Sequence, residues 1–318
     1  MNCEILHTLY VRSNGDVPCN DDAGEGVHLG RIAPHHEKWT AQSFFSNHRY
    51  RHIREAFRRG TMPWPNACPT CAFFRPNETF ADQLEQKRLR KIQIEPSLAC
   101  RLRCPGCSNH LQVQIRPQPF QMDPALFDRL LQRLQQEEFS VDEIEYCGQG
   151  EPLLHPRFSE FTRLARSHFP TTRQRLITSG NFDYVTATAQ ERLDEIMVSC
   201  DGVDQKSYVQ YRIGGRVDRP IQFMRDAVRL AGPELQLVIW KYILFEWNDH
   251  PDEIFRAQVL AQELGVAAIL FVYTHSKGKS QRFTLENRAD FPIHFPNVVT
   301  NATPIHYRDS EDPVPLPR

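Results

Sequence analysis

Three cysteines stand close together in the segment SLACRLRCPGCSNH, residues 97–110: Cys100, Cys104 and Cys107. A disulfide needs a pair of thiols, which would leave one over, and a structural zinc site usually takes four protein ligands, often as CxxC pairs. Three thiolates on one short loop would instead suit three irons of a cubane iron–sulfur cluster, leaving the fourth iron open to a small ligand. The spacing by itself leaves these sites open.

Length and composition limit the class of protein. The chain has 318 residues, of which 40% are hydrophobic, and a formal net charge of -1, so neither nucleic acid nor an anionic membrane is indicated as a partner. No apolar run approaches the roughly 20 residues of a membrane span, and the first residues, MNCEILHTLYVRSNGD, do not resemble a signal peptide. We therefore expect a cytoplasmic protein, whose nine cysteines indicate metal ligands or reactive groups before disulfides.

Strand and helix patterns alternate from residue 92 onward. Strands are predicted at 92–97, 141–148, 173–180, 193–202, 235–245 and 267–273, and helices at 124–136, 157–169, 221–232 and 252–265. This alternation predicts an α/β fold with a parallel sheet and right-handed crossovers. About 180 residues are too few for an eight-unit barrel, which needs about 250, so we expect a partial (β/α)6 barrel.

The chain is expected to have four parts. Residues 1–80 hold four cysteines and form a small N-terminal module, residues 81–91 form a charged linking helix, residues 92–275 form the barrel, and residues 276–318 are a proline-rich C-terminal extension. In parallel α/β sheets, ligands bind at the carboxyl ends of the strands. The three-cysteine loop and the segments CGQGEP, TSGN and SCDG all follow predicted strands, which places a candidate active site on that rim.

Taken together, these segments resemble the radical S-adenosylmethionine (SAM) superfamily. CRLRCPGC at 100–107 matches its CxxxCxxC signature, GQGEP at 148–152 is similar to its GGEP motif, and VSCDG with YRIGG at 198–202 and 211–215 resembles its SPASM-type branch. The resemblance covers roughly residues 90–275. It implies that Cys100, Cys104 and Cys107 hold a [4Fe–4S] cluster whose open iron binds SAM, and that reduction of the cluster splits SAM to give a 5′-deoxyadenosyl radical.

The same resemblance implies the residues that contact SAM. Gln149, Gly150 and Glu151 would line its amino group, Ser179, Ser199 and Arg212 would contact its carboxylate and ribose, and Asn248 would serve the ribose or the substrate. Two positions depart from the family pattern: residue 106 is glycine where an aromatic residue is usual, and residue 179 is serine where asparagine is frequent.

Four further cysteines precede the barrel: Cys3, Cys19, Cys68 and Cys71. With the GDVPC hairpin and the CPTC segment they resemble half of a SPASM auxiliary-cluster domain, which in better-known members follows the barrel. The resemblance implies a second, fully ligated [4Fe–4S] cluster. A structural zinc ion is the alternative, because four cysteines also satisfy a tetrahedral site.

Two cysteines remain, Cys147 and Cys200, both at predicted strand ends. Strand alternation places Cys147 on the polar face with Glu143 and Glu145, and Cys200 on the opposite face with Val198. We therefore expect Cys147 in the barrel lumen, where it could donate a hydrogen atom to a substrate radical, and Cys200 packed against helices. Each could instead be an ordinary buried small residue.

The sequence predicts an enzyme that abstracts hydrogen from a sugar-like or aminocyclitol-like small molecule and epimerises it with Cys147 as hydrogen donor. Dehydrogenation with an electron passed to the auxiliary cluster, and modification of a peptide, are the alternatives within the family. An inactive, metal-stabilised binding protein is the alternative from another class. The expected partners are the small-molecule substrate and an external flavodoxin-like or ferredoxin-like electron donor.

Overall fold

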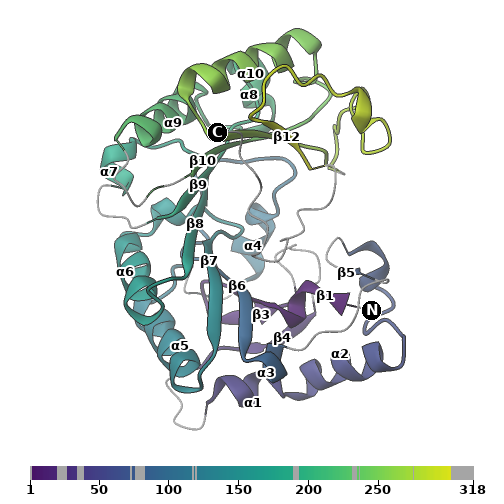
Figure 1. The fold of residues 1–318 in the computed structure, drawn as a ribbon, viewed down its shortest axis with the longest axis vertical. Coiled ribbons are helices and arrows are strands. Elements are labelled where there is room, and N and C mark those ends of the chain that lie inside the picture. The colour runs from purple at the N-terminus through teal and green to yellow at the C-terminus, as the bar shows by residue number, and fades with distance from the viewer. Residues whose placement is uncertain are drawn as a thin grey trace. The chain divides into compact units, whose positions relative to one another are not determined.

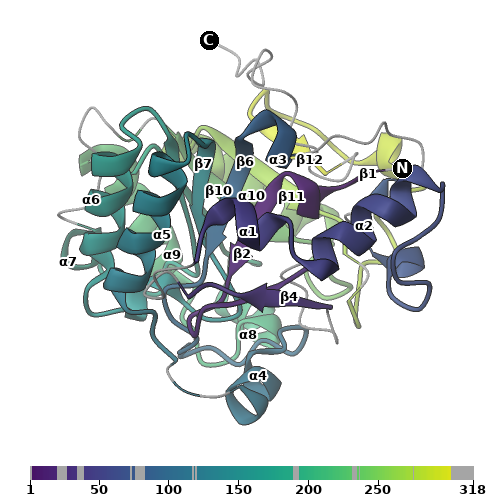
Figure 2. The same ribbon diagram turned by 90° about the horizontal axis from the view of Figure 1, so that it is seen from below.

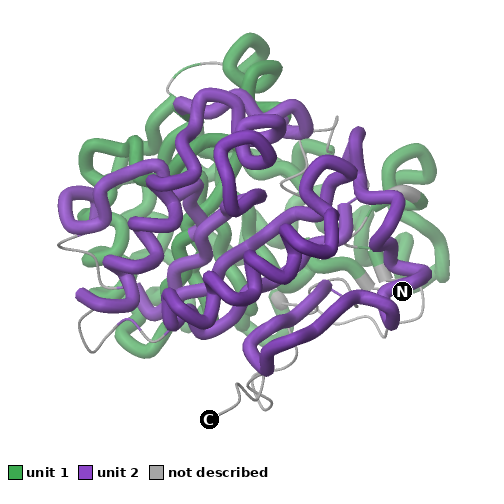
Figure 3. Tube along the Cα trace, turned by 90° about the horizontal axis from the view of Figure 1, so that it is seen from above, with its two compact units in different colours: residues 1–100, 108–176 green, residues 101–107, 177–318 purple. Residues whose placement is uncertain are grey.

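The computed structural model describes residues 2–19, 27–33, 39–71, 74–75, 83–116, 118, 120–188, 193–230, 235, 237–274 and 276–301. The chain divides into two compact units (Figure 3). The first comprises Met1–Cys100 and Ser108–Leu176, and the second comprises Arg101–Cys107 and Ile177–Arg318.

A parallel sheet forms the centre of the first unit (Figure 1). Its neighbouring strands are β2 (Thr8–Val11), β6 (Arg88–Ile94), β7 (Ser140–Tyr146) and the first part of β8 (Arg173–Thr178). Helices α5 (Pro124–Gln136) and α6 (Phe158–His168) pack side by side, with the rings of Phe127 and Phe161 5.5 Å apart (Figure 2). Tyr146 of β7 packs edge-on against Phe158, so the apolar face of the sheet is buried under α6.

Alternate residues of these strands carry charged side chains that are buried. Lys91 Nζ lies 3.2 Å from Glu145 Oε1, and the Arg175 guanidinium lies 3.3 Å from both Glu143 and Glu145. These ion pairs explain a wrong prediction. The linking helix expected at 81–91 is only the short α3 (Gln83–Gln86), and β6 already begins at Arg88, because Glu145 neutralises the Lys91 charge inside the strand.

The N-terminal segment contains two small antiparallel pairs, β3 (Asp16–Pro18) with β4 (His28–Arg31) and β1 (Asn2–Cys3) with β5 (Phe74–Arg75). The other elements here are η1 (Glu4–Leu6), α1 (Ala41–Phe45), α2 (His48–Arg58) and η2 (Cys68–Thr70). Thr40 and Asn47 accept backbone N–H groups at the starts of α1 and α2. The segment is also joined to the sheet, since β2 pairs with β6 across the expected boundary at residue 80.

A second set of parallel strands forms the centre of the second unit. It consists of β9 (Glu195–Ser199), β10 (Leu237–Ile243), β11 (Ala268–Val272) and β12 (Val298–Thr300), in that order. Helix α9 (Asp218–Leu230) packs on β9 and β10, and α10 (Pro251–Leu264) packs on β11. The remaining helices are α7 (Tyr184–Thr188), α8 (Gln205–Tyr211) and η4 (Arg288–Asp290). Gly265 ends α10 at a φ of 70°, where glycine costs little.

All six predicted strands are present, as β6 to β11. Strands β6, β7 and β8 pair in parallel, and so do β9, β10 and β11. Strand β12 shows that the C-terminal extension contributes to the same sheet as β11, whereas residues 302–318 lie outside the described part of the chain. In the described segments, no helix has both the length and the apolar composition required to cross a membrane.

Candidate cluster and cofactor site

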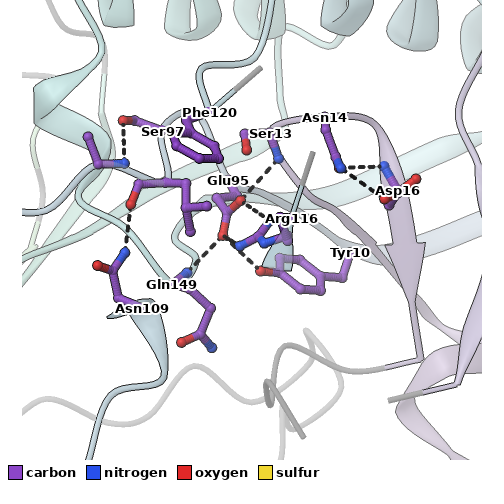
Figure 4. A network of polar contacts seen from close by, with 12 residues as sticks. Tyr10, Ser13, Asn14, Asp16, Glu95, Ser97, Asn109, Arg116, Phe120 and Gln149 are labelled. Atoms are coloured by element: carbon purple, nitrogen blue, oxygen red, sulfur yellow. Dashed lines mark hydrogen bonds and ion pairs between the residues drawn. The ribbon is translucent and has the colours of Figure 1, made fainter. Parts of the chain in front are cut away.

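The segment that carries the three cysteines is fixed at both ends in the first unit. After β6, the Leu98 N–H donates to Phe120 O at 2.7 Å, and the Ala99 N–H donates to the Ser97 hydroxyl at 3.1 Å. Asn109 begins α4 (Asn109–Ile115), and its amide donates to Leu98 O at 2.6 Å (Figure 4). This bond holds Leu98, two residues before Cys100, beside the first residue of α4.

The GQGEP segment packs tightly on the same backbone. A Cβ atom added to Gly150 would lie 2.1 Å from Ser97 O, and one added to Gly148 would lie 2.4 Å from Glu95 Cγ. No larger residue fits at either position, so the two glycines allow the approach. The Glu151 N–H donates to Ala99 O at 2.8 Å, and the Gln149 side chain accepts from the Ser108 hydroxyl at 2.9 Å.

Three predicted SAM contacts, Gln149, Gly150 and Glu151, therefore lie beside the start of the cysteine segment within the first unit. The Glu151 carboxylate is buried and accepts the Leu153 N–H at 3.3 Å, which caps the one-turn helix η3 (Pro152–Leu154). Cys147 directly follows β7 and is half-buried, and its N–H donates to Ile94 O at 2.9 Å.

The second unit places Arg212 beside a cluster-loop thiol. Arg212 NH1 donates to Cys104 Sγ at 3.7 Å, and its Nε donates to Asp201 Oδ2 at 2.6 Å. Asp201 is completely buried, and its other carboxylate oxygen accepts the Ile243 N–H at 2.7 Å. Burial raises the pKa of the Cys104 thiol, whereas the adjacent Arg212 cation lowers it more than Asp201 raises it. Arg212 therefore stabilises negative charge on this thiol.

The residues present fit an iron–sulfur cluster. All nine cysteines lie in the described part of the chain and carry thiols rather than disulfides. The Cys107 N–H donates to Cys104 O at 3.0 Å, which holds these two residues in one tight turn. Thiolates are the ligands that such clusters use, and a hydrogen-bonded cation beside them tunes the cluster potential.

The departure at Gly106 has a structural explanation. A Cβ atom at this position would lie 3.0 Å from Tyr211 Oη and 3.3 Å from Tyr211 Cε2. Tyr211 in turn packs against Phe245, with ring centroids 4.4 Å apart, and carries the Arg212 guanidinium 5.2 Å from its ring centroid. An aromatic residue from α8 thus occupies the space beside residue 106.

The structure gives Asn248 a different surrounding from the one expected. Its amide donates to Asp201 O and to Ile243 O, each at 3.0 Å, its carbonyl oxygen accepts the Phe245 N–H at 2.7 Å, and the side chain is fully buried. Both amide N–H groups and one lone pair of the carbonyl oxygen are thus used inside the protein, so Asn248 positions the loop after β10.

Ser179 and Ser199, at the ends of β8 and β9, are both almost buried. Ser179 O accepts from the Asn181 amide at 3.2 Å, and that amide also donates to Tyr208 Oη at 2.6 Å. Cys200, which was expected to pack against helices, is completely buried, and its thiol donates to Gly202 O at 3.4 Å. Sequence reasoning missed Asp201 as the partner of Arg212, although its place directly after a strand was a usable signal.

The four N-terminal cysteines come together in the first unit. Strand pairing places Cys3 opposite Phe74, close to the CxxC turn in which the Cys71 N–H donates to Cys68 O at 3.2 Å. Burial, together with the neighbouring thiols, raises the pKa of Cys3 to about 12 and that of Cys19 to about 11. In the described segments, no three His, Cys, Asp or Glu side chains are arranged around a single ion position.

One prediction tests the role of the Asp201–Arg212 pair. We expect Asp201→Asn/Arg212→Gln to make the midpoint potential of the cluster more negative, because the nearer cation is lost from Cys104. Changing both residues avoids leaving a buried charge without its partner. An EPR-monitored potentiometric titration measures the shift. The exposed pair Arg216–Asp218, changed in the same way, is the matched control and should leave the potential unaltered.

The chain is similar to known proteins in sequence and in fold. The family model described as the radical SAM superfamily matches residues 94–273. A SAM-dependent 2-deoxy-scyllo-inosamine dehydrogenase of Niallia circulans is 26% identical over 154 residues, which cover 48% of this chain and 56% of the relative. The chain therefore spans only about half the length of that enzyme.

Two solved structures of SuiB from Streptococcus suis share the fold. The complex with the precursor peptide SuiA is 13% identical with a TM-score of 0.52, covering 78% of this chain and 61% of SuiB. The complex with S-adenosylmethionine is 15% identical with a TM-score of 0.50, covering 62% of this chain and 44% of SuiB. Since the family model spans more than half of the sequence, this chain belongs to the radical SAM superfamily.

Proposed function

We propose that this protein oxidises a hydroxyl-bearing carbon of a small aminocyclitol-like or sugar-like molecule to a ketone. The observation that carries the proposal is the gathering of Cys3, Cys19, Cys68 and Cys71 in the unit that also holds the GQGEP segment. A dehydrogenation must dispose of one electron from the substrate, and a second cluster would accept it. The resemblance to a dehydrogenase that acts on 2-deoxy-scyllo-inosamine supports the same outcome.

Cys100, Cys104 and Cys107 would hold the first cluster, and Gln149, Gly150, Glu151, Ser179, Ser199 and Arg212 would bind SAM. When bound, these cofactors supply an electron to the SAM sulfonium and then a 5′-deoxyadenosyl radical that removes a hydrogen atom from the substrate carbon. The substrate radical becomes a ketone when its hydroxyl loses a proton and the carbon gives up one electron. The four N-terminal thiolates would hold the acceptor of that electron, a second [4Fe–4S] cluster.

Zinc is the alternative for the four N-terminal thiols, which lie near enough to raise one another's pKa. We propose a cluster because the same chain carries the radical SAM domain, and metal analysis separates the two. The first cluster would receive its electron from an external flavodoxin-like or ferredoxin-like protein in the reducing cytoplasm.

Epimerisation is the second candidate, and Cys147 favours it. This thiol follows β7 and is half-buried, unlike the completely buried Cys200. Its S–H could donate a hydrogen atom to the opposite face of the substrate radical. The sulfur radical left behind would then need one electron and one proton, with the external one-electron donor as the source.

The test uses anaerobically purified protein. We expect about eight iron and about eight sulfide per chain, corresponding to two [4Fe–4S] clusters. With dithionite, SAM and 2-deoxy-scyllo-inosamine in heavy water, dehydrogenation yields 5′-deoxyadenosine and a ketone in equal amounts. Epimerisation would yield an inverted alcohol carrying one solvent deuterium on the reacting carbon. Iron that supports no 5′-deoxyadenosine formation under any condition would overturn both candidates.

A further inference from the structure

Glu95 is a completely buried carboxylate directly after β6, between the sheet and the three-cysteine segment. Arg116, at the end of α4, holds it with two parallel bonds, NH1 to Oε1 at 2.6 Å and NH2 to Oε2 at 2.8 Å. Such a forked pair fixes the planes of the guanidinium and the carboxylate relative to each other. The charge of Glu95 is thus balanced inside the first unit.

The same carboxylate accepts three further donors from separate parts of the chain (Figure 4). The Gln149 N–H lies 2.9 Å from Oε2, the Ser13 N–H lies 3.1 Å from Oε1, and the Tyr10 hydroxyl lies 3.4 Å from Oε2. Two of these donors are backbone groups, so Glu95 fixes the path of the main chain at both places. One side chain thereby connects the GQGEP segment, the helix after the cysteine loop and the N-terminal segment.

The contact with the GQGEP segment is close and specific. Because a Cβ at Gly148 would lie within 2.8 Å of three Glu95 side-chain atoms, the segment can approach only where residue 148 is glycine. On the other side, Ser13 begins the turn in which the Asn14 side chain and Asp16 are hydrogen-bonded, and that turn leads into β3 and then to Cys19. Glu95 therefore contacts the flanks of both cysteine-bearing regions of this unit.

We propose that Glu95 is a positioning residue for SAM: through the Gln149 N–H it fixes the GQGEP segment in the conformation that binds SAM. The inference rests on the proposed function, because it assigns SAM to that segment. Glu95 itself does not contact the cofactor, since its two oxygens accept hydrogen bonds from within the protein and the side chain has no exposed surface. Its effect reaches SAM through the backbone of residues 148–151.

Two variants test this role. Glu95→Asp keeps the charge opposite Arg116 but withdraws the carboxylate by one methylene from the Gln149 N–H. Glu95→Gln/Arg116→Gln removes both charges, so that neither is left buried without a partner. We expect each to weaken SAM binding by about tenfold or more, the value of one charge-assisted hydrogen bond. Equilibrium dialysis at a temperature where the protein is fully folded measures the SAM dissociation constant, and iron content and melting temperature are recorded alongside.

The chain offers a matched control. Arg157 and Glu160 form a similar forked pair, at 2.6 and 2.7 Å, on the surface of the same unit. Glu160→Asp should leave SAM affinity unchanged. A role in stability alone would lower the melting temperature of the Glu95 variants without altering the dissociation constant of the folded protein. Wild-type affinity in both folded, iron-replete Glu95 variants therefore overturns the positioning role and leaves the proposed function intact. Failure of the wild-type protein to bind SAM overturns both.

Discussion

Cys104→Ala is expected to abolish SAM cleavage and to lower the iron content from about eight to about four per chain. Cys104 is one of only three thiols on the predicted cluster loop, and Arg212 stabilises negative charge on it. A cluster that already leaves one iron without a protein ligand has no spare thiolate to replace it. The measurements are iron, sulfide and 5′-deoxyadenosine after anaerobic reconstitution.

The control for this loss is another cysteine of the second unit. Cys200 is completely buried and its thiol bonds to a backbone carbonyl, so it serves packing rather than ligation. Cys200→Ala should keep full iron content and SAM cleavage, with at most a modest loss of stability from the missing sulfur. If Cys104→Ala retained 5′-deoxyadenosine formation, or Cys200→Ala lost it, the assignment of cluster ligands would be wrong.

The longer helices and strands could be predicted because they depend on local sequence patterns. Helix α5 runs from Pro124 to Gln136 as its apolar spacing and its proline start predict, and the six strands follow from short β-branched runs between turn residues. Strands β2 and β12 were missed because four-residue and three-residue strands carry too little pattern to recognise. Helix α4 was missed because it is not amphipathic: Leu111 and Ile115 are exposed.

The misassigned segment at residues 87–91 shows a different limit. Its basic residues suggested a solvent-exposed helix, yet Lys91 is buried opposite Glu145, a partner 54 positions away. Glu95 was overlooked for the same reason, since its donors come from residues 10, 13, 116 and 149. A carboxylate directly after a buried strand is a usable signal, but its importance depends on long-range pairing that one sequence does not reveal.

The same limit applies to the candidate site residues. The motif positions could be located from spacing, and the structure brings Gln149, Gly150 and Glu151 to the cysteine segment. Which side-chain groups are available to a ligand could not be predicted from this spacing. Asn248 makes three hydrogen bonds inside the protein, and the Nε of Arg212 is hydrogen-bonded to Asp201. Which groups remain for a ligand depends on burial and competition for hydrogen bonds, and both are properties of the folded chain.

The proposed dehydrogenation makes a sharp prediction for the N-terminal thiols. In Cys68→Ser/Cys71→Ser, we expect 5′-deoxyadenosine formation to continue while ketone formation is lost. The first cluster and the GQGEP segment do not use these residues, so the first hydrogen abstraction remains possible. The substrate radical, however, no longer has an acceptor for its electron. Liquid chromatography of both products, at matched protein folding, gives the ratio of ketone to 5′-deoxyadenosine.

A comparison with Cys147→Ala allows this ratio to distinguish dehydrogenation from epimerisation. If the enzyme dehydrogenates, the loss of Cys147 leaves the ratio unchanged and only the N-terminal double variant uncouples the reaction. If it epimerises, the result reverses: Cys147→Ala makes 5′-deoxyadenosine without inverted product, and the double variant still forms inverted product because the external one-electron donor regenerates the thiol. A double variant that forms ketone at the wild-type ratio would show that the N-terminal thiols hold no electron acceptor. The neighbouring thiols, among them Cys3 and Cys19 with their raised pKa, would then contribute to the fold and not to electron transfer.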